Sequence, residues 1–233
     1  MLVERDFPYS EMKMLASARS AGKEVVFDGE TYVIEELTED SFDGVDIALF
    51  SAGGSISKKF GPLAAAKGCF VVDNSSAFRM DPDVPLVIPE VNPEAMADYK
   101  LGGARKGGII ANPNCTTMVA MPVMKPLADE AGLEAMIIST YQAVSGAGLS
   151  GVRELDEQAQ KVGADGPELT YDGRAVSIDE GPNFVKPIAF NVLPFAGALV
   201  DDGLDETNEE QKLRFESRKI MGLPDLKVSG TCV

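Results

Sequence analysis

Short apolar runs alternate with stretches of helical periodicity through the first half of the chain. The runs Val45 to Phe50, Cys69 to Val72 and Gly108 to Ala111 are typical of buried strands. Between them, Ile56 to Lys67 and Asn92 to Tyr99 carry apolar residues at helical spacing. Strands that alternate with helices predict a parallel, doubly wound sheet of the Rossmann type, in an α/β domain that we place at residues 1–131.

The pattern before this alternation is less regular. Met1 to Phe7 resembles the last turns of an amphipathic helix that stops at a proline, and Lys13 to Ala16 is a short strand. Val25 to Phe27 and Thr31 to Ile34 flank an Asp-Gly pair, which predicts a β-hairpin.

From Leu133 onward the pattern changes to longer and more widely spaced elements. We interpret residues 132–233 as an α+β domain, and we expect both domains to be incomplete, because the chain opens in a helix and stops in a strand. The elements predicted here are strands at Met136 to Val144, Ile188 to Leu193 and Lys227 to Val233, and helices at Gly151 to Lys161 and Glu209 to Met221.

Charge, hydrophobicity and the cysteine and histidine content limit which classes of protein this chain can belong to. The 233 residues carry a net charge of −16, which disfavours nucleic acid as a partner, and no apolar run is long enough to cross a membrane. The odd, widely spaced set Cys69, Cys115 and Cys232 predicts a reducing, cytoplasmic compartment. The sequence has no histidine, so we expect no metal site and neither a Cys-His dyad nor a Ser-His-Asp triad.

The strongest candidate for chemistry is the segment from Asn112 to Thr117. It follows a predicted strand and leads into the periodic stretch Met118 to Ala131, which places Cys115 at the start of a helix. Unpaired N–H groups and the helix dipole favour a thiolate there, and the thiolate is the nucleophilic form. A small buried cysteine is the alternative interpretation.

Other polar groups follow predicted strands, where ligands of such sheets bind. Ser51 to Ser55 could approach a phosphate or serve as a tight turn, and Ser17 to Lys23 offers hydroxyls and cations or is a solvated loop. Asn74 and Arg79 could capture an anion. In the second half, the candidates are Gln142, which is either a core amide or a substrate contact, and Glu209 with Lys212, whose simplest interpretation is an exposed ion pair.

Taken together and in order, six motifs resemble aspartate-semialdehyde dehydrogenase. The resemblance implies reductive dephosphorylation of 4-phospho-L-aspartate to L-aspartate 4-semialdehyde with NADP, in lysine, threonine and methionine biosynthesis, by a homodimer that binds a small-molecule substrate and phosphate. The motifs are Ser17 to Lys23, Ser51 to Ser55, Asp73 to Arg79, Asn112 to Thr117, Tyr141 to Gly148 and Glu209 to Lys212.

The same resemblance assigns roles to individual residues. Cys115 forms the thioacyl-enzyme and Gln142 orients the substrate. The implied substrate and phosphate contacts are Arg79, Asn114, Lys212 and Glu209, the last toward the substrate amine. The implied cofactor contacts are Ser17, Arg19, Ser20, Ser51, Ala52, Gly53, Ser145 and Gly146.

Two departures from that family shape the functional expectation. The family opens with a strand and a glycine-rich pyrophosphate turn, and these 233 residues contain neither. The family also continues past its last strand to an Arg and a His, whereas this sequence stops at Val233 and contains no histidine. We therefore expect this chain to be an interior piece that is inactive alone. The alternatives are an enzyme like N-acetyl-glutamyl-phosphate reductase and a non-catalytic module that only forms dimers.

Overall fold

The computed structural model describes residues 2–97, 99 and 107–233 of the chain. The chain divides into two compact units, Met1–Pro113 and Asn114–Val233, which are described separately. Our predicted domain boundary between residues 131 and 132 stays a prediction. No helix in the described part of the chain is long and apolar enough to cross a membrane.

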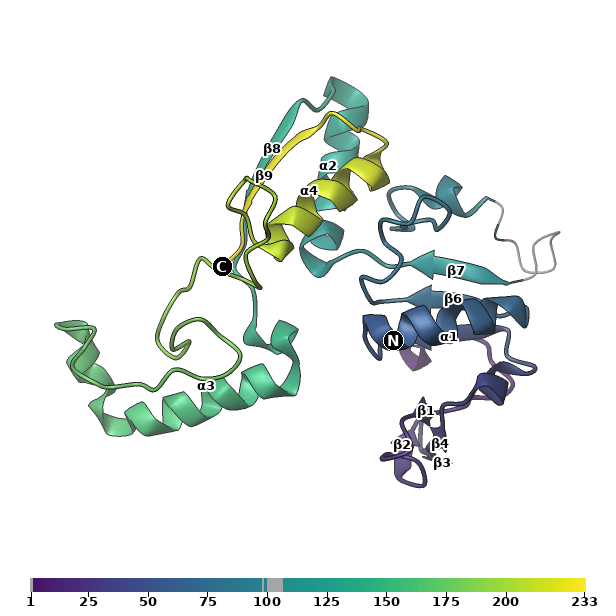
Figure 1. Cartoon of the computed structure of the whole chain (residues 1–233), viewed down its shortest axis with the longest axis horizontal. Coiled ribbons are helices and arrows are strands. Elements are labelled where there is room, and N and C mark those ends of the chain that lie inside the picture. Colours follow the sequence, from purple (N-terminus) through teal and green to yellow (C-terminus); the bar gives the residue numbers. More distant parts are fainter. Residues whose placement is uncertain (1, 98, 100–106) are drawn as a thin grey trace. The chain divides into compact units, whose positions relative to one another are not determined.

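The first unit is built on a parallel sheet. Strands β5 (Ile47–Phe50), β6 (Phe70–Asp73) and β7 (Gly108–Ala111) lie side by side in that order. Helix α1 (Gly54–Ala66) connects β5 to β6 and packs against β6 and β7 (Figure 1). This strand-helix-strand arrangement is what the apolar runs predicted.

An aromatic cluster closes the core beside this sheet. Phe42, in the 3₁₀ helix η2 (Glu39–Phe42), stacks on Phe50 of β5 and contacts Phe60 of α1. All three rings are buried. Aromatic side chains bury large apolar areas, so this cluster fixes η2, β5 and α1 to one another.

The predicted hairpin is confirmed. Strands β2 (Glu24–Phe27) and β3 (Glu30–Val33) pair antiparallel, and the turn residues Asp28 and Gly29 have φ values of 50° and 80°. Positive φ at both positions matches the twist of the two strands, which is why Asp-Gly is favoured there. Nearby, β1 (Leu15–Ala16) pairs in parallel with β4 (Glu35–Glu36).

Two expected helices of the first unit are shorter than predicted. Near the N-terminus only η1 (Val3–Arg5) forms, as a 3₁₀ turn, and Met1 lies outside the described residues. A helix was expected at 92–99, and the structure has the 3₁₀ helix η3 (Pro93–Met96) there. Residue 98 lies outside the described residues. Asn92 does not cap this helix, because its side chain bonds Ile88 N–H and Leu86 O instead.

The second unit joins two helices to a pair of strands. Strand β8 (Ala135–Ser139) pairs in parallel with β9 (Lys227–Thr231). Helix α4 (Asn208–Met221) packs against both β9 and helix α2 (Cys115–Ala131), as Figure 1 shows. Both helices and both strands were predicted, but β8 ends at Ser139 rather than at Val144, where η4 begins, and its pairing with β9 was not predicted.

Helix α3 (Gly148–Val162) organises the irregular part of the second unit, between η4 (Val144–Ala147) and η5 (Gly163–Thr170). Here the predicted strand at 188–193 is wrong. The buried Gln158 side chain on α3 accepts hydrogen bonds from the N–H groups of Ile188 and Ala189, at 2.8 and 3.1 Å. These donors are therefore satisfied by a side chain rather than by a neighbouring strand.

The predicted fold class is confirmed. A Rossmann-like domain with a parallel sheet is followed by a domain of mixed helix and strand content. The carboxyl ends of β1, β5, β6 and β7 all lead into the polar loops that the sequence singled out.

Candidate active site

Cys115 is the first residue of α2, and its side chain is exposed. Asn114 caps this helix: its Oδ1 accepts hydrogen bonds from Thr116 N–H at 3.1 Å and from Thr116 Oγ1 at 2.5 Å. The Cys115 Sγ lies 3.9 Å from the same oxygen. The cap explains why the helix begins here, and it leaves the cysteine at the accessible end of the helix.

Helix α4 supplies polar partners to the cap residue. The Glu209 Oε2 accepts a hydrogen bond from Asn114 Nδ2 at 2.9 Å, and the Glu209 Oε1 pairs with Lys212 Nζ. These two side chains are mostly buried, at 16% and 27% exposed. The structure thus brings together Asn114, Cys115, Glu209 and Lys212, and the pair on α4 is not the exposed ion pair of the simplest interpretation.

Helix α4 is itself well anchored. Thr207 and Glu210 form a reciprocal capping box at its start, with Glu210 Oε2 accepting from Thr207 N–H at 2.7 Å. Gly222 ends the helix with a left-handed φ of 64°. Such caps fix the helix ends, so the polar face of α4 is held in place beside α2.

Gln142 follows β8 in the same unit. Its Oε1 accepts a hydrogen bond from Thr140 Oγ1 at 3.1 Å, and its N–H donates to Val233 O at 2.6 Å. Val233 N–H in turn bonds Thr140 Oγ1 at 3.2 Å. The amide is therefore held at the carboxyl ends of β8 and β9, and it is partly exposed rather than a core group.

The other two cysteines have different surroundings. Cys69 is buried, and burial, followed by the negative charge of Asp46, raises its pKa to about 11. Cys232 is also buried, and burial together with the charges of Glu210, Glu209 and Cys115 raises its pKa. Neither thiol is readily ionised near neutral pH, so Cys115 is the accessible candidate.

Arg79 lies at the carboxyl end of the sheet in the first unit and is buried. Its Nε donates to Asn112 O at 2.8 Å and its Nη2 to Asn74 O at 3.0 Å, while Asn112 Nδ2 bonds Asn74 Oδ1 at 2.8 Å. The guanidinium therefore ties together the loops that follow β6 and β7. A phosphate contact from Arg79 stays a prediction.

The loop after β6 is fixed by the carboxylate of Asp73, which is fully buried. Its Oδ1 accepts from Ser57 Oγ at 2.7 Å and from Ser75 N–H at 3.0 Å, and its Oδ2 accepts from Ser75 Oγ at 2.9 Å. A buried carboxylate with several donors is well satisfied. It joins α1 to the loop that carries Arg79.

The predicted cofactor residues lie in exposed turns. Ser51, Ala52 and Gly53 separate β5 from α1, and Gly53, with φ at 88°, begins the helix without a side-chain cap. Free N–H groups at the start of a helix suit a phosphate-bearing group, so this turn fits a dinucleotide. The turn of Ser17, Arg19 and Ser20 follows β1, with Ser20 N–H bonded to Ser17 O at 2.8 Å. Ser145 and Gly146 lie exposed in η4 of the second unit.

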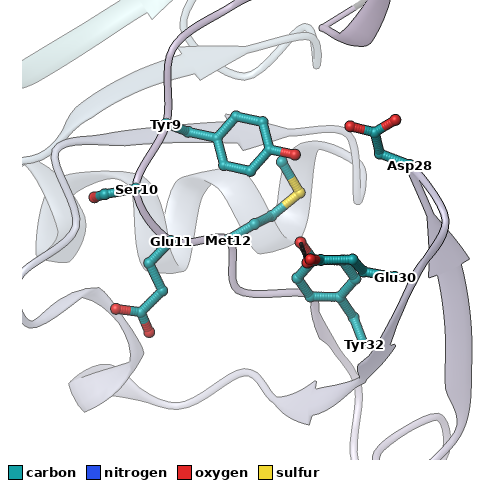
Figure 2. Close-up of a pocket in the computed structure, with 7 residues that line it drawn as sticks. All are labelled: Tyr9, Ser10, Glu11, Met12, Asp28, Glu30 and Tyr32. Atoms are coloured by element: carbon teal, nitrogen blue, oxygen red, sulfur yellow. Dashed lines mark hydrogen bonds between the residues drawn. The ribbon is translucent and has the colours of Figure 1, made fainter.

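One cavity, of about 480 Å³, lies beside the β2–β3 hairpin. Figure 2 shows the tyrosine rings and carboxylates that line it, and Tyr32 OH donates to Glu30 Oε2 at 3.1 Å. Three carboxylates without a cation in the lining disfavour an anionic substrate or a dinucleotide. The lining residues are Tyr9, Ser10, Glu11, Met12, Asp28, Glu30 and Tyr32.

Sequence reasoning missed Glu216. This buried side chain on α4 accepts a hydrogen bond from Asn114 N–H, at 2.6 Å from the amide nitrogen. A signal was available, because Glu209, Lys212 and Glu216 recur at spacings of three and four residues and so share one helix face. The partner of Glu216, 102 residues away, could not be identified from that spacing.

Comparison with known proteins first defines the class. A semialdehyde dehydrogenase NAD-binding domain model matches residues 1–99, and a semialdehyde dehydrogenase dimerisation domain model matches residues 124–233. The structure is similar to a crystal structure of aspartate semialdehyde dehydrogenase II complexed with ASA from Vibrio cholerae. That match has a TM-score of 0.86 and 42% identity, over 99% of this chain and 63% of the other.

Curated relatives then identify the particular family. The chain is 59% identical to an aspartate-semialdehyde dehydrogenase from Streptomyces akiyoshiensis over all 233 residues, which cover 66% of that protein. It is 55% identical to one from Corynebacterium glutamicum, of which it covers 67%. The chain belongs to the aspartate-semialdehyde dehydrogenase family, and it spans about two thirds of the length of these relatives.

Proposed function

We propose that this chain carries the nucleophile and substrate contacts for NADP-dependent reductive dephosphorylation of 4-phospho-L-aspartate to L-aspartate 4-semialdehyde. The observation that carries the proposal is the placement of Cys115, exposed at the first position of α2 beside the Asn114 cap. This reaction belongs to lysine, threonine and methionine biosynthesis. Its proposed compartment is the cytoplasm.

The chemistry assigned to the cysteine is acyl transfer. The Cys115 thiolate attacks the acyl carbon, the carbon–oxygen bond to phosphate breaks, and phosphate leaves from a thioacyl-enzyme. NADPH, when bound, would supply the hydride that reduces this thioester to the aldehyde, and the Cys115 sulfur would leave as the thiolate. The role proposed for Gln142 is to orient the substrate, which its fixed position after β8 supports.

The surrounding residues are proposed to bind the charged groups of the substrate. Lys212 and Arg79 are proposed to supply the positive charge that a phosphate requires, and Asn114 to supply a neutral side-chain donor. Glu209 is proposed to face the substrate amine. Its existing bond to Lys212 supports this assignment, because it shows that this carboxylate accepts from an ammonium group.

The proposed cofactor contacts lie on three turns. Gly53 and its neighbours Ser51 and Ala52 would approach the dinucleotide through backbone N–H groups. The turn after β1 would hold the ribose phosphate, and η4 would contribute a third surface. The residues proposed for the β1 turn and η4 are Ser17, Arg19, Ser20, Ser145 and Gly146.

The proposed assembly is a homodimer formed through residues 132–233, following the Rossmann-type domain at 1–131. The match of a dimerisation domain model to residues 124–233 supports a dimer. Sedimentation of the 233-residue chain tests the proposal, because a dimer is expected at micromolar concentration. A monomer at all concentrations would argue against it.

Peptide mapping tests the proposed function most specifically. We expect incubation with 4-phospho-L-aspartate to add one aspartyl group to the Cys115 peptide, whereas N-acetyl-glutamyl phosphate adds nothing. Cys115→Ser is the matched control, since serine keeps the side-chain size but is a far weaker nucleophile. Equal acylation by both acyl phosphates would reject the substrate assignment, and acylation at another residue would reject Cys115.

A further inference from the structure

Glu216 is a buried carboxylate on the same face of α4 as Glu209. Its residue is only 1% exposed, and it lies seven residues after Glu209, about two helical turns along α4. Burial of a carboxylate is costly unless hydrogen bonds compensate for the lost water. The hydrogen-bond partners of Glu216 therefore indicate the role of this buried carboxylate.

One of those groups is the main chain immediately before the nucleophile. The Asn114 N–H donates to Glu216 Oε2, with 2.6 Å between the nitrogen and the oxygen. This distance is short for an N–H···O hydrogen bond. The bond fixes the peptide plane that enters α2, one residue before Cys115.

Asn114 is held at a second point by the same helix. Its Nδ2 donates to Glu209 Oε2 at 2.9 Å, which directs its Oδ1 to the Thr116 N–H. With the N–H and the side-chain amide both bound to α4, Asn114 is restricted in main chain and side chain. The first turn of α2, and Cys115 with it, is thereby set by α4.

We propose that Glu216 is a positioning residue for the nucleophile, which acts by holding the main chain of Asn114. This inference rests on the proposed function, in which Cys115 attacks the acyl carbon. Its physical basis is geometric: a misplacement of about 1 Å in an active site can lower a rate roughly a hundredfold. In this proposal, the length of the side chain and its acceptor oxygen hold the Asn114 N–H. The negative charge of the carboxylate is not required for that role.

Three variants separate reach from charge. Glu216→Gln keeps the length and one acceptor oxygen but removes the charge, whereas Glu216→Asp keeps the charge and shortens the reach by one methylene. Glu216→Ala removes both. Glu130→Gln and Glu130→Asp are the matched controls, because Glu130 is exposed near the far end of the helix that Cys115 begins.

Two measurements on the 233-residue chain read out the effect. Amide hydrogen exchange reports the main chain at 114–118, and phosphate released per Cys115 from 4-phospho-L-aspartate reports the reaction. We expect Glu216→Ala and Glu216→Asp to accelerate exchange at 114–118 at least about tenfold, with β9 unchanged, and to slow phosphate release by a similar factor. Glu216→Gln should stay within about threefold of the parent chain in both measurements, as should the Glu130 controls.

The opposite ranking would overturn the inference. If Glu216→Asp matches the parent chain while Glu216→Gln does not, charge rather than position is what Glu216 supplies. If Glu216→Ala leaves exchange at 114–118 unchanged, Asn114 is not held by this bond. A parent chain that releases no phosphate would reject the proposed function for these residues, and the exchange pattern would still decide the role of Glu216.

Discussion

At the scale of single residues, the three cysteines occupy different environments. Cys115 is exposed at a helix start, whereas Cys69 is buried and its pKa is raised to about 11, first by burial and then by Asp46. A raised pKa means that the Cys69 thiol keeps its proton as the pH rises until about pH 11. Alkylation requires the thiolate, so Cys69 should react only at strongly alkaline pH or after unfolding.

We therefore expect alkylation of the folded chain at pH 7–8 to label Cys115 first. Iodoacetamide labelling followed by peptide mapping measures the order, and the same reaction in denaturant provides the control in which all three thiols react. Labelling of Cys69 as fast as Cys115 in the folded chain would contradict the assignment of Cys115 as the accessible nucleophile.

Arg19 gives a second prediction at this scale, for cofactor choice. It is exposed in the turn after β1, and that turn contains no acidic residue between Ser17 and Lys23. A charge-assisted bond to the 2′-phosphate of NADP contributes about 1.5–3 kcal/mol, which is a tenfold to hundredfold preference.

Arg19→Ala should therefore weaken NADPH binding by roughly tenfold to a hundredfold and leave NADH binding nearly unchanged. Titration calorimetry with both cofactors measures this ratio, and Lys58→Ala, which removes a cation from the exposed side of α1, is the control for net charge. Parallel losses with both cofactors would indicate a structural role for Arg19.

At the scale of elements, one side chain of α3 binds the main chain of the segment that was predicted to be a strand at 188–193. We call these hydrogen bonds of Gln158 the Gln158 clamp. Gln158 Oε1 binds Ile188 N–H and Ala189 N–H, and Gln158 Nε2 donates to Asp179 O at 3.1 Å. Removal of this side chain would leave backbone groups without partners, and an unpaired buried group costs about 1–3 kcal/mol.

We expect Gln158→Ala to lower the free energy of unfolding by about 1–3 kcal/mol or to open residues 179–189 locally. Urea denaturation and limited proteolysis measure these two outcomes. Gln160→Ala, on the exposed side of the same helix, should have little effect. A Gln158→Ala chain with unchanged stability and unchanged cleavage at 179–189 would mean that the clamp contributes nothing.

Elements with a local sequence signature were predicted correctly, whereas structure that depends on a distant side chain was not. The strand at Gly108 to Ala111 and the start of α2 were predictable, because a strand, a turn and a helix start each leave a local signature. The strand at 188–193 was not, since its N–H partner is a side chain 30 residues earlier. The sequence indicated Arg79 as a candidate anion contact, which stays a prediction, and it gave no sign that Arg79 binds Asn74 O and Asn112 O.

At the scale of the whole molecule, the chain combines a dinucleotide-binding domain with a domain of the semialdehyde dehydrogenase dimerisation type. Its sequence contains a candidate cysteine nucleophile and candidate anion-binding residues but no histidine. The proposed thioacyl chemistry needs a proton donor and acceptor near neutral pH, and general acid–base catalysis contributes about a hundredfold to ten-thousandfold. We therefore expect these 233 residues to undergo acylation without completing the reductive cycle.

The most direct test of this account follows phosphate and NADPH absorbance together after the chain is mixed with 4-phospho-L-aspartate. The account predicts a burst of about one phosphate per Cys115, no burst in Cys115→Ser, and no sustained loss of NADPH absorbance. A burst that persists in Cys115→Ser would contradict the assignment of the nucleophile. Sustained NADPH consumption that disappears in Cys115→Ser would contradict the expectation that the chain alone cannot turn over.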